Sequence, residues 1–263
     1  MSEDSVLMRA SPEGVATITL NRPEVHNAFN AEVIERLSDV LEDLAGADGV
    51  RVALFEAAGK SFSAGADLNW MKHAATFTEA ENLEDARALS QMLNRLSTLP
   101  KPTVALVQGA AFGGGVGLMA ACDMVIAVES AAFSLSEIKL GLIPATISPY
   151  VIAAIGERQA RRYFQTGERI AADEARRIGL VHEVVDDAEA LAAAGKRMVE
   201  RLFAAPPGAL AEAKDLIAAV AGRPIDAALI EDTARRIAAR RSHAEAGEGI
   251  AAFLEKRKPG WHG

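Results

Sequence analysis

Two glycine-containing turns each follow an apolar, strand-like run, and such turns can present backbone N–H groups to a ligand. The first turn is Ser61–Leu68, and the second runs from Gly109 to Leu118. Small residues let the backbone approach a ligand closely, and a helix that starts at Gly114 or Gly115 would direct its positive end toward the same point. The two turns could therefore hold an oxyanion, although tight packing of strand against helix explains either turn alone equally well.

Glu137 is an acidic residue whose neighbours in the sequence suit proton transfer. Phe133–Ser136 before it and Ile138 after it are apolar or small. Such surroundings would remove water from the carboxyl group and raise its pKa toward the range of a general acid or base. A surface glutamate beside Lys139, or a charge at a helix start, is the alternative interpretation.

Several other catalytic motifs fail on spacing. Gly59-Lys60-Ser61 lacks the earlier glycine of a phosphate-binding loop, because Leu54 stands there. The glycines after Phe112 lack the third small residue of a dinucleotide site, because that position is Leu118. A Gly-x-Ser-x-Gly elbow is absent, and the five histidines show no metal-ligand spacing. The sequence therefore favours neither a serine hydrolase nor a metal site.

The elements that must position the two turns alternate between strands and helices over the first 190 residues. Asn30 is placed to cap the first helix and Pro100 to stop the second. The strands are too apolar to face water on either side, which indicates an α/β fold. By residue type and periodicity we predict strands at Val15–Leu20, Arg51–Glu56, Thr103–Val107 and Asp123–Val128, and helices at Ala31–Leu44, Glu79–Leu99 and, as a short turn, from Ser136.

From Asp187 onward the chain is rich in alanine and helical throughout. Pro206-Pro207 and Gly222–Pro224 divide it into segments. The amphipathic faces of these segments need a partner, either the α/β body or another subunit, so we expect an oligomer. We accordingly divide the chain into a core with the active site, residues 1–195, and a helical region for oligomerisation and closure over the ligand, residues 196–263.

Composition narrows the class of protein. Of 263 residues, 50% are hydrophobic and 24% charged, which suits a globular protein, and the net charge of -8 argues against a nucleic-acid partner. The single cysteine, Cys122, excludes an intramolecular disulfide, and the acidic start Met1–Asp4 lacks a signal peptide, so we expect a cytoplasmic protein. The uncharged run Thr103–Cys122 contains Gln108 and five glycines, which favours a buried strand, turn and helix over a membrane span.

The two glycine turns and Glu137, taken in order with the further segments given below, resemble the crotonase (enoyl-CoA hydratase/isomerase) superfamily over nearly the whole chain. The resemblance implies a crotonase-type spiral of β-β-α turns with a C-terminal α-helical trimerisation region, assembled as a homotrimer or a dimer of trimers. The matching segments are Asn21–Pro23, Asn27–Asn30, Phe62–Leu68, Gln108–Gly115, Cys122-Asp123, Glu137-Ile138, Gly141–Pro144 and Ala252–Arg257.

The resemblance also implies a reaction. The N–H groups of Ala64 and Gly114 would hold the thioester oxygen of an acyl-CoA, where negative charge develops as an enolate. Donors fixed before the reaction stabilise such charge by about 3 kcal/mol each. Glu137 matches the position of a catalytic glutamate in the family. The CoA thioester is then the substrate, and no metal or organic cofactor is expected.

Further positions match the CoA-binding residues of the family. Phe253 and Lys256 would reach the adenine and the 3′-phosphate, often from a neighbouring subunit, and lysine suits a phosphate as a mobile point charge. An amphipathic helix with a surface lysine is the alternative interpretation. Four residues would line the CoA groove mainly through backbone atoms: Ala28, Ala66, Asp67 and Leu68.

Gly117 departs from the pattern of many hydratases, which carry a second glutamate there to hold and activate water with the first. Its absence raises the alternatives of an isomerase that uses Glu137 alone and of a protein that binds acyl-CoA without converting it.

A finer resemblance nevertheless favours hydration. The segments Gly109–Leu118, Phe133–Glu137 and Gly141–Tyr150 are similar to a bacterial branch usually assigned to methylglutaconyl-CoA hydratase of leucine catabolism, which also tends to have glycine at this position. We therefore expect hydration of a branched or carboxylated enoyl-CoA. Lys72 and His73 are candidate partners for the distal carboxylate, although a solvated loop explains them as well.

Overall fold

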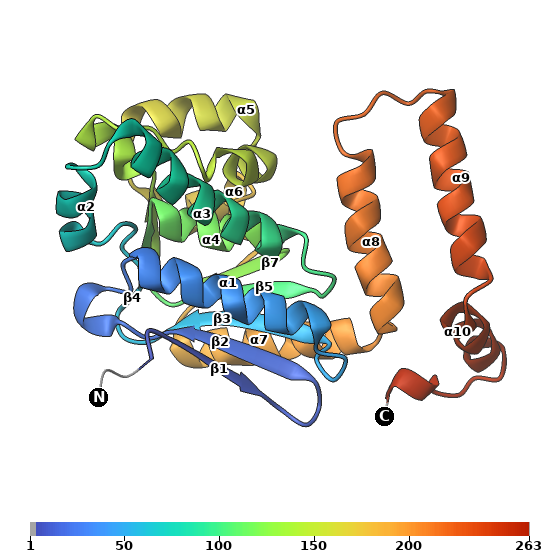
Figure 1. Cartoon of the computed structure of the whole chain (residues 1–263). Helices are drawn as coiled ribbons and strands as arrows, with labels where there is room; N and C mark the ends of the chain where they lie inside the picture. Colours follow the sequence, from blue (N-terminus) through green and yellow to red (C-terminus); the bar gives the residue numbers. More distant parts are fainter. Residues whose placement is uncertain (1–3, 263) are drawn as a thin grey trace.

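The apolar runs of the sequence form a six-stranded sheet in the computed structural model, which describes residues 4–262 (Figure 1). All neighbouring pairs are parallel except the first, β1 and β2. The predicted strands at 15–20, 51–56, 103–107 and 123–128 are confirmed to within one residue. In sheet order the strands are β1 (Val6–Ala10), β2 (Val15–Leu20), β3 (Val52–Ala57), β5 (Thr103–Val107), β7 (Met124–Val128) and β10 (Glu183–Val185).

A second, four-stranded sheet was not predicted as separate strands. It consists of β4 (Ser61–Ser63), β6 (Ala110–Phe112), β8 (Ala132–Ser134) and β9 (Ile170–Ala171), in that order. Three of these short strands follow β3, β5 and β7 along the chain, and each is followed in turn by helical structure. The chain thus repeats a strand, strand and helix unit, which is the expected spiral of β-β-α turns.

Helices pack around the sheets through apolar faces. Asn30 accepts a hydrogen bond from the Val33 amide at 3.0 Å and so caps the first helix as predicted. That helix, α1, packs against α3, while α7 packs on β3, β5, β7 and β10. The body helices are α1 (Ala31–Gly46), α2 (Leu68–Ala74), α3 (Glu79–Ser97), α4 (Gly114–Ala121), α5 (Ser148–Thr166), α6 (Ala172–Arg177) and α7 (Ala188–Phe203), with a 3-10 turn, η2, at Ser136–Leu140.

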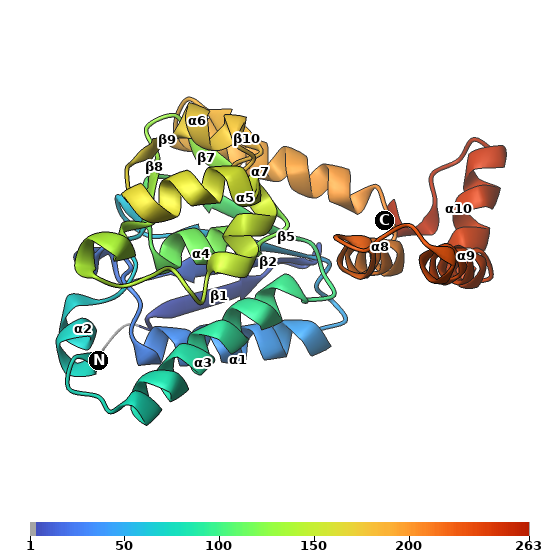
Figure 2. The same cartoon turned by 90° about the horizontal axis from the view of Figure 1, so that it is seen from above.

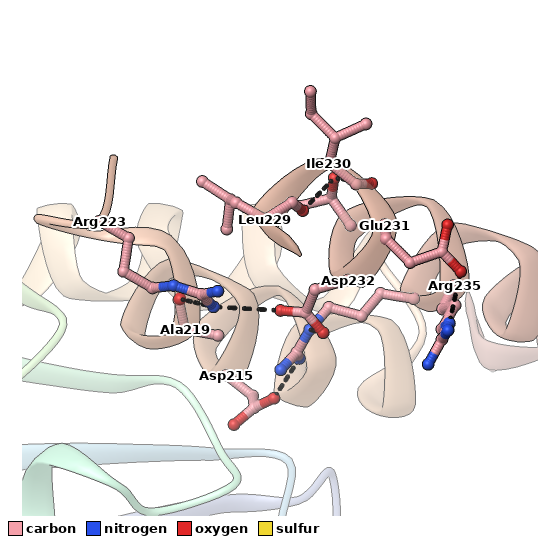
Figure 3. A network of polar contacts seen from close by, with 10 residues as sticks. Asp215, Ala219, Arg223, Leu229, Ile230, Glu231, Asp232 and Arg235 are labelled. Carbon is pink, nitrogen blue, oxygen red and sulfur yellow. Dashed lines mark hydrogen bonds and ion pairs between the residues drawn. The ribbon is translucent and has the colours of Figure 1, made fainter. Parts of the chain in front are cut away.

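Residues 207–262, here called the C-terminal arm, stand apart from this body in both views (Figures 1 and 2). The arm contains α8 (Pro207–Val220), α9 (Ala227–Arg241) and α10 (Ala244–Leu254). Ion pairs join its helices, among them Arg223 to Asp232 at 3.3 Å and Arg236 to Asp215 at 2.5 Å (Figure 3). Lys214 ties the arm to the body through an ion pair with Asp123 at 2.9 Å.

The division predicted at residue 195 falls inside α7. Leu191, Ala194, Gly195 and Val199 of this helix are all buried. Because α7 packs on the large sheet, the structural change from body to arm comes after it, at the Pro206-Pro207 pair.

The uncharged segment Thr103–Cys122 forms β5, β6 and α4, as predicted. Across residues 4–262, none of the helices has both the length and the apolar character that crossing a bilayer requires.

Candidate active site

A cavity of about 590 Å³ lies where the two glycine turns meet Glu137. Its walls come from the turns, from α2, from the first half of α3 and from the segment between η2 and α5. Most lining side chains are apolar, including Trp70, Met71, Leu89, Leu142 and Ile143. The structure therefore brings Glu137 together with Gly114 and Ala66, which are 23 and 71 residues away in the sequence, around a space suited to an acyl chain.

The first turn presents the N–H group of Ala66 to this cavity. The Phe29 amide donates to the Gly65 carbonyl oxygen at 2.6 Å, and the Asp67 amide donates to the Phe29 carbonyl oxygen at 2.8 Å. Successive N–H groups of an extended segment point to opposite sides, so the Ala66 N–H faces away from Phe29. It has no acceptor within residues 4–262, and Ala66 lines the cavity.

The Ala64 N–H group, expected from the sequence to hold the thioester oxygen, donates instead to the His26 carbonyl oxygen at 2.9 Å. That donor is already engaged within the chain, so the expectation for Ala64 is wrong and the available donor of the first turn is Ala66. The two alanines flank Gly65 symmetrically in the sequence. Only the pairing with the segment that contains Phe29 distinguishes them.

The second turn opens helix α4. The Gly113 amide donates to Ser134 at 2.9 Å, and α4 begins at Gly114. The first N–H groups of a helix have no partner inside it, and the Gly114 N–H finds no acceptor elsewhere in the described part of the chain. The turns touch at Gly65, whose φ is +88° and where an added Cβ would lie 2.9 Å from the Phe112 carbonyl oxygen. Only glycine permits this approach.

Glu137 lies in the first turn of η2, with its carboxyl group against the start of α4. A Cβ added to Gly113 would lie 3.1 Å from Glu137 Oε1. The second oxygen, Oε2, is buried and has no hydrogen-bond partner in the described residues. Burial raises the pKa of Glu137 above its ordinary value. The result is a partly desolvated carboxyl group beside the cavity, with one oxygen unpartnered, suited to proton transfer.

Gly117 does not leave an empty place for a second carboxylate. A Cβ at this position would overlap Cγ2 of Ile147 and would lie 2.8 Å from its Cβ. Ile147 is 1% exposed and lines the cavity. An isoleucine thus fills the position of the family's second glutamate. The sequence carried no signal for this contact, because the two residues are 30 positions apart.

The Asp67 side chain organises the expected CoA groove rather than facing it. Its carboxylate pairs with Arg22 at 2.9 Å and accepts from the Asn69 and Trp70 amides at the start of α2. Although burial opposes the shift, these hydrogen bonds and Arg22 hold the pKa of Asp67 below its ordinary value. Arg22 also donates to the Ala28 carbonyl oxygen at 2.8 Å. One guanidinium group thus connects Ala28 and Asp67, two of the residues expected to line the CoA groove.

Asp85 is a second acidic residue of the cavity that the sequence did not reveal. Burial raises the pKa of Asp85, opposed by a hydrogen bond with the Trp70 side chain. In the described residues no lysine, arginine or histidine lines this cavity. Lys72 and His73, the candidate partners of a substrate carboxylate, are exposed on α2 outside the lining.

Phe253 and Lys256 do not reach the cavity within one chain. Both are exposed on the arm, Phe253 by 81%, and α10 lies across the molecule from α2 (Figure 1). Leu68, a third expected CoA contact, is 74% exposed at the cavity rim. The structure thus brings the two turns and Glu137 together. It does not bring Phe253 and Lys256 of the C-terminal motif to the same cavity.

Comparisons with known proteins agree with this architecture. The family model described as enoyl-CoA hydratase/isomerase matches residues 10–263. The crystal structure of an enoyl-CoA hydratase from Shewanella pealeana is 43% identical, with a TM-score of 0.94 over 98% of this chain and 96% of that one. An enoyl-CoA hydratase/isomerase from Marinobacter aquaeolei is 34% identical, with a TM-score of 0.92 over 98% and 99%. The 1,2-epoxyphenylacetyl-CoA isomerase of Escherichia coli is 34% identical over 254 residues, which cover 95% of this chain and 96% of that protein.

Proposed function

The chain belongs to the enoyl-CoA hydratase/isomerase family, and from that premise we propose that it adds water reversibly to a 2-enoyl-CoA thioester. One observation carries the proposal: the Glu137 carboxyl group, whose Oε2 is unpartnered, shares a cavity with the Ala66 and Gly114 N–H groups, which have no acceptor in the described residues. A carboxyl group and two fixed donors are the parts that enolate chemistry requires.

The two N–H groups bind the thioester oxygen, which becomes negatively charged as water attacks C3. Each such donor stabilises the charge by about 3 kcal/mol, because it is oriented before the reaction begins. Glu137 transfers the proton at C2, and the burial that raises its pKa increases the fraction of the acid form at neutral pH. The two N–H groups stabilise the negative charge on the thioester oxygen, so the proposed reaction needs no metal or organic cofactor.

An isomerase is the second candidate, and the isoleucine beside Gly117 favours it. With Ile147 in place of a second carboxyl group, Glu137 alone could remove a proton from one carbon and return it to another. The similar protein from Escherichia coli is named an isomerase. Double-bond migration of this kind needs no water molecule in the cavity.

For the substrate we propose a branched, carboxylated enoyl thioester, 3-methylglutaconyl-CoA, which would place the protein in leucine degradation. Support comes from the segments shared with the bacterial hydratase branch and from the room in the cavity for a branched chain.

For the assembly we propose a homotrimer or a dimer of trimers. Large apolar side chains of the arm, among them Ile225 at 87% and Ile217 at 70% exposure, would be covered by neighbouring subunits. Phe253 and Lys256 would then contact CoA bound to another protomer. In this proposal the helical region forms the contacts between subunits, and the core contains the catalytic residues.

Mass spectrometry of enoyl-CoA esters incubated in ¹⁸O-labelled water tests the function. Straight, branched and carboxylated esters are compared with the purified protein. Gain of one labelled water, greatest for 3-methylglutaconyl-CoA, is the expected result. Unchanged mass with an altered retention time would indicate the isomerase. Binding without any conversion would leave a protein that only holds acyl-CoA.

A further inference from the structure

The reacting centre holds one carboxyl group where hydration has two proton transfers to perform. Glu137 lies on one side, against Gly113. On the side of Gly117 the wall is apolar, because Ile147 fills it and Val116 and Leu118 are buried beside it. No described side chain of that wall can accept a proton.

Adding water requires a base for the water and an acid for C2 at nearly the same time. The burial of Glu137 favours its protonated form, which is the form that donates to C2. While Glu137 serves as this acid, it cannot also accept the proton of the attacking water. The missing component is therefore the base that holds the attacking water near C3.

We propose that the substrate supplies this base: a carboxylate attached through one CH₂ group to C3 takes the place of the second glutamate. The inference rests on the hydratase function proposed above and deepens it. A water molecule that attacks C3 while donating to such a carboxylate closes a six-membered ring that includes the shared proton. Groups joined in this way act at a very high effective concentration.

The lining of the cavity leaves such a carboxylate free to act. In the described residues no cation lines the cavity, so no ion pair would lower the basicity of the substrate's carboxylate. Ser136 and Thr146, next to Glu137 and Ile147 in the sequence, offer neutral hydroxyl groups in the lining. The cavity thus offers the carboxylate hydroxyl groups but no cation among the described residues.

The proton and electron movements balance. The substrate's carboxylate takes one proton from water as the water oxygen bonds to C3. The C2=C3 electron pair moves into the C1–C2 bond, and the thioester oxygen becomes negative beside the Ala66 and Gly114 N–H groups. Protonated Glu137 then donates to C2 as the enolate collapses. The proton on the substrate's carboxyl group passes to Glu137, directly or through water, and both groups return to their starting state.

Asp85 is the rival for this role, since it is the other carboxyl group that lines the cavity. It lies in the first half of α3, which forms part of the cavity wall. A base supplied by Asp85 would serve charged and uncharged substrates alike. A base supplied by the substrate would serve only the carboxylated one, and this difference separates the two.

The first test compares 3-methylglutaconyl-CoA with its terminal carboxamide in the unmodified enzyme. The two acyl groups have nearly the same size, and only one carries a base. We expect kcat/KM for hydration of the acid to exceed that of the amide by about 100-fold or more. Equal values would overturn the inference while leaving the hydratase function intact. Conversion of neither ester would overturn both.

The second test returns a carboxyl group to the protein. The double variant G117E/I147G removes both Cγ2 and Cβ of Ile147, so the nearest remaining atom, Cα, lies 3.7 Å from the new Cβ. It is expected to raise hydration of the amide about tenfold. G117Q/I147G has the same shape without the carboxylate and should give no gain. A gain in both variants would contradict the inference, because added space alone would then account for it. In Asp85→Asn hydration of the acid should persist, and its loss would assign the base to Asp85.

Discussion

The body and the C-terminal arm are stabilised by different forces. In the body, strands β5 and β7 and one face of α1 are buried in a continuous apolar core. In the described residues of the arm, only Leu229 and Ala252 are buried, while ion pairs join its helices. The body has an apolar core of its own, with exposed apolar side chains such as Leu68 and Ile143 beside the cavity, whereas most apolar side chains of the arm are exposed. The candidate active site lies in the body, and in the proposed oligomer the arm would contact another subunit.

The largest expected effect lies entirely in the body. Glu137→Gln removes the proton that is transferred at C2 but keeps the size of the side chain. We expect kcat to fall by about 1000-fold, with affinity for CoA esters and the oligomeric mass unchanged. Steady-state kinetics, isothermal titration with a saturated acyl-CoA and light scattering would measure the three quantities. Turnover close to that of the unmodified enzyme would remove Glu137 from the reaction.

The contact between the two turns is the next most sensitive point. Gly65→Ala adds a Cβ at a left-handed φ and 2.9 Å from the Phe112 carbonyl oxygen, so the Ala66 and Gly114 donors should move apart. We expect kcat to fall about 100-fold, as for loss of one oxyanion donor. Gly46→Ala is the matched control, since a Cβ there meets nothing within 4 Å. Equal effects of the two variants would show that the close approach of the turns does not matter.

The arm should act on binding rather than on the chemical step. In Phe253→Ala and Lys256→Gln we expect KM for CoA esters to rise about tenfold, a loss of about 1.4 kcal/mol in binding, with kcat nearly unchanged. Lys258→Ala, an exposed lysine nearby, serves as the control. A fall in kcat without a change in KM would contradict the assigned role in CoA binding.

Four strands of the large sheet were predictable because they have five or six residues of a regular apolar pattern, whereas β1 and β10 were not predicted. Thr103–Val107 forms a strand with the predicted bounds. The strands of the second sheet have only two or three residues, such as Ser61–Ser63 and Ala110–Phe112. A run that short carries no periodicity, so the sequence showed these segments only as turns.

The candidate site was predictable to the extent that its geometry is local. The start of α4 at Gly114 follows from the glycine run. The choice between Ala64 and Ala66 depends on a bridge to Phe29, and the role of Gly117 depends on Ile147. Both contacts join distant parts of the chain. Family motifs therefore predicted which turns form the candidate site, and tertiary packing determines which N–H groups of those turns are already engaged.

A pH-dependent gain in stability should accompany the loss of activity in Glu137→Gln. The pKa of Glu137 is higher in the folded protein than in the unfolded chain. Its contribution to stability is therefore full below the unfolded pKa and is lost as pH rises through the folded pKa. At neutral pH the glutamine variant should melt higher by roughly 3 °C. Calorimetry should show this gain vanish below the ordinary pKa of glutamate, and a gain independent of pH would contradict the assignment.

The smallest effect is expected where the arm is stabilised by charge alone. Arg236 pairs with Asp215 on α8 and with Asp232 on its own helix, and these acidic side chains are 70% and 35% exposed. Exposed ion pairs contribute little and are screened by salt. Arg236→Ala should therefore lower the melting temperature by less than about 2 °C, and 1 M NaCl should abolish the difference. A larger loss that disappears in salt would mean that the ion pairs, rather than contacts with another subunit, hold the arm, and a loss that persists in salt would mean that Arg236 acts through packing rather than charge.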